Sequence, residues 1–279
     1  MPHNLQPTKG RRQKPKPPVK WAGGKTQLLS QFAPLFPRQK YNLYLEPFVG
    51  GGAVFFHLQP SAAILIDSNA ELINFYRVVR DNLEQLLEDL AKHKNTREYY
   101  YSLRALDPEK LSPVQRASRF LYLNKTAYNG LWRVNSKGRF NVPFGRYKNP
   151  RIIDEENLQL VAGALRRAEL LAGDFSLVLK LAPPGAFVYF DPPYDPLSET
   201  ANFTSYTPGS FTREDQLRLS RVFAELDRRG CLVMLSNSDT PFIRSLYSSY
   251  NIRVVTARRA INCRPDGRGP VTELVIRNY

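Results

Sequence analysis

Cysteine and histidine are scarce in this chain, which has two cysteines and three histidines among 279 residues. Cys231 lies in an apolar run and Cys263 lies in a loop that carries glycine and proline, so a disulfide framework is excluded. The few cysteines and histidines do not form the spaced clusters that bind zinc. We therefore expect no metal site.

Long apolar segments are also missing, since no run is long enough to cross a bilayer and no basic amphipathic helix carries an aromatic face. Residues 1–18 have basic side chains and prolines without an apolar core, so they do not predict a signal peptide. They predict a basic disordered tail, for which a binding role and a role in solubility are both open. We expect a cytoplasmic protein with no membrane partner.

Negative charge is in short supply. The sequence has 40 Lys and Arg against 25 Asp and Glu, which gives a net charge of +15 and a pI near 9.9. Such an excess favours a polyanionic partner, and nucleic acid fits best.

The imbalance is greatest in residues 111–153, which contain nine basic residues, no acidic residue and several aromatic residues. The basic residues are Arg116, Arg119, Lys125, Arg133, Lys137, Arg139, Arg146, Lys148 and Arg151. We interpret the segment as an inserted binding lobe in which basic side chains neutralise phosphates, while Asn129 and Asn135 offer contacts to base edges. The alternative is a small helical subdomain with a solvated basic face.

Outside this segment, short apolar runs alternate with helical patterns. The runs at 41–45, 63–66, 186–190 and 231–235 predict strands, and the patterns at 26–36, 70–94 and 213–229 predict helices. This alternation predicts an α/β fold with a mostly parallel, doubly wound sheet. Two further strands are expected at 252–258 and 272–279, around a basic loop at 264–269.

The sequence Asp191-Pro192-Pro193-Tyr194 directly follows the strand expected at 186–190. The prolines restrict the backbone, so the Asp191 carboxylate and a proline carbonyl are held ready to accept the two N–H bonds of a planar amine. Tyr194 would stack on the base that carries this amine. A plain proline-rich turn is the alternative. The loop at 195–210 is rich in Ser, Thr and Pro and is expected to cover the site.

Residues 46–52, Glu-Pro-Phe-Val-Gly-Gly-Gly, follow the strand expected at 41–45. Their glycines allow a sharp turn and a close approach to a ligand, and Asp67 at the end of the next strand suits ribose hydroxyls. The same pair would also serve NAD, although Phe55 stands where the dinucleotide fingerprint has its third glycine. Asp174 and Phe175 would supply an acceptor and a ring to an adenine.

Three motifs, KWAGGK at 20–25, EPFVGGG at 46–52 and DPPY at 191–194, occur in this order and resemble the Dam-type family of DNA adenine-N6 methyltransferases. The stretches at 124–133, 140–147, 197–206 and 236–240 are similar to that family as well, so the resemblance covers nearly everything after Val19. It implies a Rossmann-like S-adenosylmethionine-dependent methyltransferase sheet with an inserted, mainly helical DNA-recognition lobe. Residues 19–77 and 153–279 would form the catalytic domain, and residues 78–152 the target-recognition domain.

The resemblance implies transfer of a methyl group from S-adenosylmethionine to N6 of an adenine that is flipped out of double-stranded DNA. We expect direct displacement without a covalent enzyme intermediate, with Asp191, Pro192, Pro193 and Tyr194 as the catalytic residues. The residues expected around the cofactor are Trp21, Lys25, Glu46, Phe48, Gly50, Gly52, Asp67, Asp174, Phe175 and Asp191.

The resemblance also implies GATC as the target, with Lys20 and Arg133 reading guanine acceptors. Methylation of this site would mark DNA for restriction-modification, or for repair and replication, in a prokaryotic nucleoid. The residues expected to contact DNA, from the resemblance and from the charge of the lobe, are Lys20, Arg116, Tyr128, Asn129, Leu131, Arg133, Asn135, Lys137, Arg139, Pro143 and Arg146.

Two other functions stay open. DPPY also occurs in enzymes that methylate amino groups of RNA bases, and a non-enzymatic DNA-binding protein could keep the same scaffold. A cytosine-C5 methyltransferase is disfavoured, because its nucleophilic cysteine usually follows a proline, whereas Cys231 follows Gly230 and Cys263 follows Asn262. We expect a monomer with no obligate protein partner.

Overall fold

The computed structural model describes residues 13–195, 211–258 and 270–279. Nearly all of the loop expected at 195–210, the stretch at 197–206, the basic loop at 264–269, Cys263 and most of the basic tail lie outside these ranges. The strands are β1 Tyr44–Glu46, β2 Ala63–Asp67, β3 Ala168–Ala172, β4 Phe187–Phe190, β5 Leu232–Ser238, β6 Asn251–Arg258 and β7 Pro270–Arg277.

Helices of different lengths connect most of these strands. The α-helices are α1 Leu29–Phe32, α2 Ala53–Leu58, α3 Ala70–Asp81, α4 Leu83–Leu90, α5 Arg97–Ala105, α6 Pro113–Thr126, α7 Glu155–Leu165, α8 Val178–Leu181, α9 Arg213–Arg228 and α10 Pro241–Leu246. The 3-10 helices are η1 Lys25–Leu28, η2 Ala33–Leu35, η3 Pro108–Lys110, η4 Tyr128–Gly130 and η5 Phe175–Leu177.

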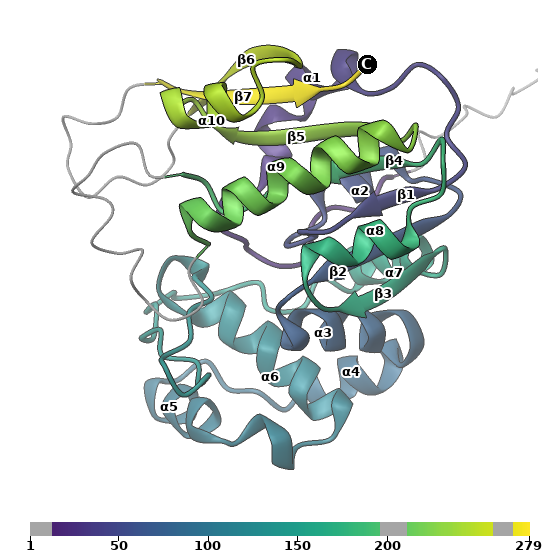
Figure 1. The fold of residues 1–279 in the computed structure, drawn as a ribbon. Helices are drawn as coiled ribbons and strands as arrows, with labels where there is room; N and C mark the ends of the chain where they lie inside the picture. The colour runs from purple at the N-terminus through teal and green to yellow at the C-terminus, as the bar shows by residue number, and fades with distance from the viewer. Residues whose placement is uncertain (1–12, 196–210, 259–269) are drawn as a thin grey trace, which may run out of the picture.

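The strands form one sheet in the order β3-β2-β1-β4-β5-β7-β6 (Figure 1). Strands β1 to β5 are parallel, and β7 runs antiparallel between β5 and β6. The prediction of a mostly parallel, doubly wound sheet is confirmed. The order reverses between β1 and β4, and in such sheets ligands bind in the crevice beyond the carboxyl ends of the strands at the reversal.

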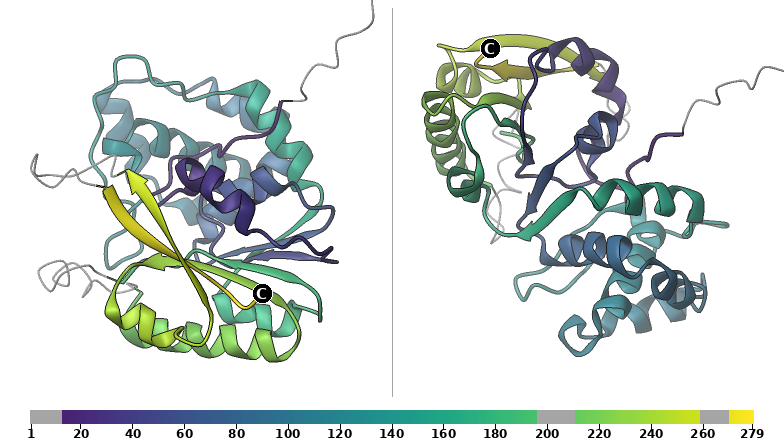
Figure 2. Two further views of the ribbon diagram at one scale, coloured as in Figure 1. Left: turned by 90° about the horizontal axis from the view of Figure 1, so that it is seen from above. Right: turned by 90° about the vertical axis from the view of Figure 1, so that its right-hand side faces the viewer.

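Strand β4, at the centre of the sheet, is buried on both faces, which explains why all four of its residues are apolar. In β4, Phe187 and Tyr189 join one core cluster, while Val188 and Phe190 join the other. The first cluster includes side chains of α2, α3 and α7, and the second includes side chains of α8, α9 and α10. Figure 2 shows these helices on opposite sides of the sheet.

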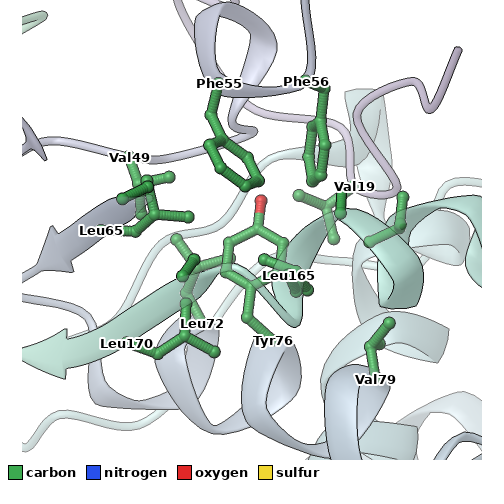
Figure 3. Packing of buried hydrophobic residues seen from close by; sticks show 14 of the residues in the cluster. Val19, Val49, Phe55, Phe56, Leu65, Leu72, Tyr76, Val79, Leu165 and Leu170 are labelled. Carbon is green, nitrogen blue, oxygen red and sulfur yellow. The ribbon is translucent and has the colours of Figure 1, made fainter. Parts of the chain in front are cut away.

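Tyr76 of α3 ties this helix to the glycine-rich turn after β1. Its ring is fully buried and points its hydroxyl toward Phe55 and Phe56, with Leu165 packed nearby (Figure 3). The hydroxyl donates a hydrogen bond of 2.7 Å to the carbonyl oxygen of Gly50. A buried hydroxyl requires such a partner, so the core itself fixes the position of the turn.

Helices α4, α5 and α6 lie beyond the β3 edge of the sheet, below it in Figure 1. Helix α6 packs along α3, where the rings of Phe75 and Phe120 are 5.5 Å apart. It begins at a capping box of Ser112 and Gln115, with Pro113 in the first helical position. The segment has its own small core, which contains Tyr100, Tyr122, Leu123, Ala127, Phe140 and Val142.

After α6 the chain is mostly irregular from 127 to 154, apart from η4 and two isolated bridges, Ala127 with Phe144 and Val134 with Phe140. Trp132 anchors this stretch, because its ring lies 4.3 Å from that of Phe120 and 4.7 Å from that of Phe140. The position of the residues that follow Trp132 is therefore fixed by its packing on these two rings.

Two helix predictions differ from the structure. The helix expected over 70–94 breaks at Asn82, whose φ of −139° is not helical, and α4 then turns to pack against α6. The pattern at 26–36 forms only short 3-10 and α-helical turns around Pro34. In addition, β3, α2, α7, α8 and α10 were not expected, whereas α5 and α6 lie in the lobe that was expected to be mainly helical.

The prediction of a disordered tail over 1–18 is wrong for residues 13–18. Pro15 and Pro18 are buried, and the Lys16 backbone forms hydrogen bonds of 2.8 and 3.0 Å with the Asn157 side chain of α7. Within the described ranges, no helix has the length and apolar character needed to cross a membrane. The same ranges contain no cluster of three or more side chains suited to hold a metal ion.

Candidate active site

The candidate site lies where β1, β2 and β4 end, at the reversal of strand order. Glu46 closes β1, Asp67 closes β2, and Asp191 is the first residue after β4. Parallel strands share one carboxyl edge, so the three carboxylates meet there, and the charges of Asp191 and Asp67 both act on Glu46. The structure thus brings together the two motifs on which the nucleotide and amine sites were predicted.

Lys25 holds the Asp191 carboxylate. Its ammonium lies 2.8 Å from Oδ1 of Asp191 and donates to the carbonyl of Gly23 at 2.6 Å. Ser236 Oγ donates to the same Oδ1 at 2.9 Å. The Lys25 side chain is 4% exposed and that of Asp191 is 19% exposed. Burial raises the pKa of Asp191, while Lys25 and Ser236 act in the opposite direction.

The two prolines differ in what their carbonyl groups do. Gln216 Nε2 donates to the carbonyl of Pro193 at 2.9 Å, and Gln216 Oε1 accepts from Asn237 Nδ2 at 2.9 Å. Within the described residues, the Pro192 carbonyl accepts no hydrogen bond. Gln216 was missed by the sequence analysis, because a single glutamine in the amphipathic pattern of α9 gives no signal until its burial is known.

Tyr194 is fixed from two directions. Its hydroxyl donates to Glu273 Oε2 at 2.6 Å, and the Lys25 ammonium lies 4.7 Å from the centre of its ring. Burial raises the pKa of Glu273, which belongs to β7. Glu273 was also missed, and its only signal was an acidic residue directly before the apolar run at 274–276.

The glycine-rich turn approaches its neighbours too closely for side chains. At Gly50, with a φ of +45°, a Cβ atom would lie 2.6 Å from Cδ1 of Trp21, and at Gly52, with a φ of +70°, a Cβ atom would lie 2.8 Å from Phe56. The Gly50 amide donates to Asp67 Oδ2 at 3.0 Å, and the Asn69 amide donates to Oδ1 at 2.9 Å. Asn69 also caps α3.

This turn fits the adenosine part of S-adenosylmethionine. Each oxygen of Asp67 has a second lone pair that can accept a hydrogen bond from a ribose hydroxyl. The hydrogen bond from the Gly50 amide keeps the turn directly beside this carboxylate. These acceptor oxygens therefore match the ribose of the cofactor that the resemblance implies.

Glu46, by contrast, has a structural position. Its Oε2 accepts from the hydroxyl of Tyr44 at 2.8 Å and from the amide of Phe55, in the first turn of α2, at 3.1 Å. The side chain is buried, and burial raises its pKa to about 8. These contacts hold α2 next to the glycine-rich turn. Glu46 would therefore act on the cofactor only indirectly, by fixing the turn.

Replacing Glu46 with glutamine is expected to flatten the pH dependence of stability. A carboxyl with a pKa near 4.5 when unfolded and about 8 when folded favours the folded state at low pH. The free energy of unfolding then falls by about 1.4 kcal/mol per pH unit as the pH rises between these two values. Urea unfolding at pH 5.5, 6.5 and 7.5 measures this slope in the wild type and in Glu46→Gln.

Glutamine in place of Glu84, an exposed residue of α4, is the matched control and should leave the slope unchanged. Groups such as Asp67 and Asp191, whose pKa values are also raised, contribute in both proteins. An equal slope in wild type and Glu46→Gln would show that Glu46 is ionised in the folded protein.

Phe48 and Phe175 form an aromatic surface next to the turn. Their rings are stacked with centres 5.4 Å apart, and Arg218 of α9 lies 4.2 Å from the centre of the Phe175 ring. Arg218 also binds both oxygens of Asp174, at 2.8 and 2.9 Å, and the pKa of Asp174 is lowered to about 2 because hydrogen bonds from Arg218 and Ser176 outweigh its desolvation. Asp174 would thus have to share its acceptor capacity with Arg218 to bind an adenine.

Three of the residues predicted to contact DNA lie together on one exposed turn at 128–131. Tyr128 is 54% exposed, and Asn129, with a φ of +53°, and Leu131 are exposed beside it. Arg133 is exposed and donates to Asn141 Oδ1 at 2.8 Å. The ammonium of Lys20 lies 4.3 Å over the ring of Tyr147. The other exposed side chains of the predicted set are Asn135, Lys137, Arg139, Pro143 and Arg146.

Some predicted contacts have other partners. Arg116 forms an ion pair with Glu71 of α3, and Asn135 Oδ1 accepts from the amides of Lys137 and Arg139 to close a turn. The prediction that Arg119 neutralises a phosphate is wrong. Arg119 is buried, because its guanidinium donates to the carbonyls of Leu103 and Arg104 at the end of α5.

A cavity of about 700 Å³ lies between the start of α3 and the 131–141 segment. Arg104, Arg133 and Arg139 line it, together with Trp132 and Asn69. Arg133, which lines this cavity, lies two residues after the exposed turn at 128–131.

Comparison with known proteins agrees with this geometry. The model of a family described as D12 class N6 adenine-specific DNA methyltransferase matches residues 21–261. The type II methyltransferase M1.LlaDCHI of Lactococcus lactis subsp. cremoris is 48% identical over 272 residues, which cover 95% of each chain. The type II methyltransferase M.MjaIII of Methanocaldococcus jannaschii is 44% identical over 286 residues, covering 95% of this chain and 99% of that one.

A DNA adenine methylase of Escherichia coli K12 is 40% identical over 261 residues, which cover 92% of this chain and 93% of that one. The similarity thus extends over both the sheet and the segment between α3 and α7. The matched family acts on DNA, so neither an RNA base as substrate nor a non-catalytic scaffold gains support.

Proposed function

Because this chain belongs to the D12 class of N6 adenine-specific DNA methyltransferases, we propose that its target is the adenine of GATC. The enzyme transfers a methyl group from S-adenosylmethionine to N6 of adenine in DNA. The observation that carries the GATC proposal is the exposed turn at 128–131, followed by Arg133, in a stretch that resembles the Dam-type recognition signature.

We propose that the cofactor lies on the glycine-rich turn, with its ribose on Asp67 and its adenine near Phe48 and Phe175. When bound, it supplies an electrophilic methyl carbon on a sulfonium centre. Trp21, which packs against Gly50 in this turn, would help to hold it. Lys25 acts on the cofactor side through Asp191, which it holds at 2.8 Å.

The chemistry of the amine follows from the acceptors that are free. Oδ1 of Asp191 is taken by Lys25 and Ser236, whereas within the described residues Oδ2 receives no donor. We propose that Oδ2 and the Pro192 carbonyl accept the two N–H bonds of N6, which directs the nitrogen lone pair toward the methyl carbon. Both acceptors are fixed in advance, so positioning supplies most of the rate enhancement.

Tyr194 would stack on the flipped adenine and replace the neighbours that the base loses. Its ring is already held by Glu273, so little conformational freedom is lost when the base enters. Pro193 shapes the same turn while Gln216 occupies its carbonyl.

We propose that residues 78–152 form the target-recognition domain and that residues 19–77 and 153–279 form the catalytic domain. Lys20 and Arg133 would read guanine, while Tyr128, Asn129, Leu131 and Pro143 would contact or wedge the site. Of the other predicted contacts, Lys137, Arg139 and Arg146 are exposed and free to reach phosphates.

The direct test uses labelled S-adenosylmethionine and two duplexes that differ only in GATC against a scrambled site. After digestion to nucleosides, label in N6-methyladenine from the GATC duplex alone would support the proposal. Equal label in both duplexes would keep the reaction and reject the target sequence.

Replacing Arg133 with alanine is expected to relax discrimination at one base pair by about 1–3 kcal/mol, because a guanine would lose its donor. The measurement is kcat/KM on GATC and on duplexes altered at one position at a time. Arg151→Ala is the matched control, since Arg151 is exposed in the same basic stretch and pairs with Asp154 at 2.9 Å. Unchanged sequence preference in Arg133→Ala would remove Arg133 from base readout.

A further inference from the structure

Asn124, near the end of α6, is bound to the backbone of a single residue in a distant part of the chain. Its Oδ1 accepts from the Lys20 amide at 2.8 Å, and its Nδ2 donates to the Lys20 carbonyl at 2.7 Å. The side chain is fully buried. A flipped amide would oppose donor to donor and acceptor to acceptor, so these two bonds define one orientation of Asn124 and one position of the Lys20 backbone.

The same amide also reaches the exposed turn of the lobe. Asn124 Nδ2 lies 3.4 Å from the carbonyl oxygen of Gly130. Gly130 has a φ of +62°, and a Cβ atom on it would lie 2.2 Å from Cδ of Lys20. The stem of Lys20 therefore packs against the backbone of the turn that contains Tyr128, and the lack of a side chain at Gly130 makes this approach possible.

The ammonium group of Lys20 also contacts the lobe. Its ammonium lies over the ring of Tyr147 at 4.3 Å. Lys125, one residue beyond Asn124, is partly buried, and burial and the charge of Lys20 lower its pKa to about 8. Backbone, stem and ammonium of Lys20 are thus each set by groups of the 124–147 segment.

We infer that Asn124 is a positioning residue for sequence readout, which fixes Lys20 so that its ammonium meets one guanine of the target. This inference rests on the proposed reading of guanine by Lys20. Lysine has a long side chain with many rotamers, so a base is discriminated only if the stem starts from a fixed point. Loss of the two Asn124 hydrogen bonds would let the Lys20 backbone move, while the phosphate contacts of the lobe would stay in place.

The test compares Asn124→Ala, Asn124→Asp and Lys20→Ala by kcat/KM on GATC and on duplexes altered at one position at a time. Asn124→Asp keeps the acceptor for the Lys20 amide but places an oxygen against the Lys20 carbonyl. Both Asn124 variants are expected to lower discrimination about tenfold at the base pair that Lys20→Ala relaxes, and at no other. Adding Asn124→Ala to Lys20→Ala should cause no further loss there, as expected for residues that act as one unit.

Asn74→Ala is the matched control, because Asn74 Nδ2 likewise donates to a backbone carbonyl, that of Pro113, at 3.0 Å, but does not touch Lys20. If Asn124→Ala does not fold, Asn124→Asp carries the test, because it keeps the size of the side chain and the acceptor for the Lys20 amide. We expect it to relax the same base pair.

The outcomes separate the inference from the function on which it rests. If Lys20→Ala relaxes one position while the Asn124 variants keep the wild-type preference, the inference is overturned and readout by Lys20 stands. If Lys20→Ala leaves the preference intact, the assignment of Lys20 to guanine fails, and the inference fails with it. A uniform loss of activity on every duplex would reduce Asn124 to a structural residue.

Discussion

Replacing Asp191 with alanine is expected to lower kcat by at least about a thousandfold while leaving the affinity for DNA within about tenfold of the wild type. Loss of one fixed acceptor at a reacting centre costs about a hundred- to a thousandfold in rate, and Asp191 also carries the contact to Lys25. Affinity for DNA comes mainly from phosphate contacts made by other residues. Single-turnover methylation and a binding titration measure the two quantities.

Asp191→Asn serves as a graded variant, because it keeps the shape and one acceptor oxygen without the charge. Asp239→Ala is the control for loss of a carboxylate nearby, since Asp239 follows β5 and pairs with Arg244 instead. Equal losses of turnover and DNA binding in Asp191→Ala would assign Asp191 a structural role.

Replacing Lys25 with methionine should destabilise the protein by about 3 kcal/mol, because removal of one partner from a buried ion pair leaves the other without compensation. The pKa of Asp191 should rise further, since Lys25 is the main group that lowers it. Asp191 then stays protonated up to a higher pH than in the wild type, and the protonated carboxyl is the poorer acceptor for the amine. The acidic limb of the kcat profile should therefore move to higher pH.

The control is Lys92→Met, which breaks the pair of the exposed Lys92 with Asp89 on the protein surface. Such pairs contribute less than about 1 kcal/mol, so neither the unfolding midpoint nor the pH profile should change appreciably. If Lys25→Met loses stability but keeps the wild-type pH profile, the ionisation of Asp191 does not control the rate.

The strands at the centre of the sheet could be predicted because a strand that is buried on both faces needs a continuous run of apolar residues, which is easy to recognise in the sequence. Strand β4 is apolar at every position and was expected almost at its observed bounds. Strand β3 was not expected, because its sequence Ala-Glu-Leu-Leu-Ala has the composition of a helix. Only its pairing with β2 at the edge of the sheet makes it a strand, and a single sequence does not contain that information.

The site shows the same division. Asp191 and Asp67 could be predicted because a carboxylate at the end of an apolar strand is unusual and points to the edge where ligands bind. Gln216 and Glu273 could not, since they reach the site from α9 and β7 only after the sheet has formed. Arg119 shows the converse, because charge alone does not reveal that a guanidinium is used to cap a helix.

The two tryptophans of the sequence have separate places in the structure. Trp21 packs on the Gly50 turn, and Trp132 lies between two aromatic rings of the lobe. Indole emission responds to the polarity and quenching groups around each ring, so the protein contains one intrinsic fluorophore beside each of its two proposed ligand sites. In Trp132→Phe the emission reports on Trp21 alone, which would let the order in which cofactor and DNA bind be followed in real time without any added dye.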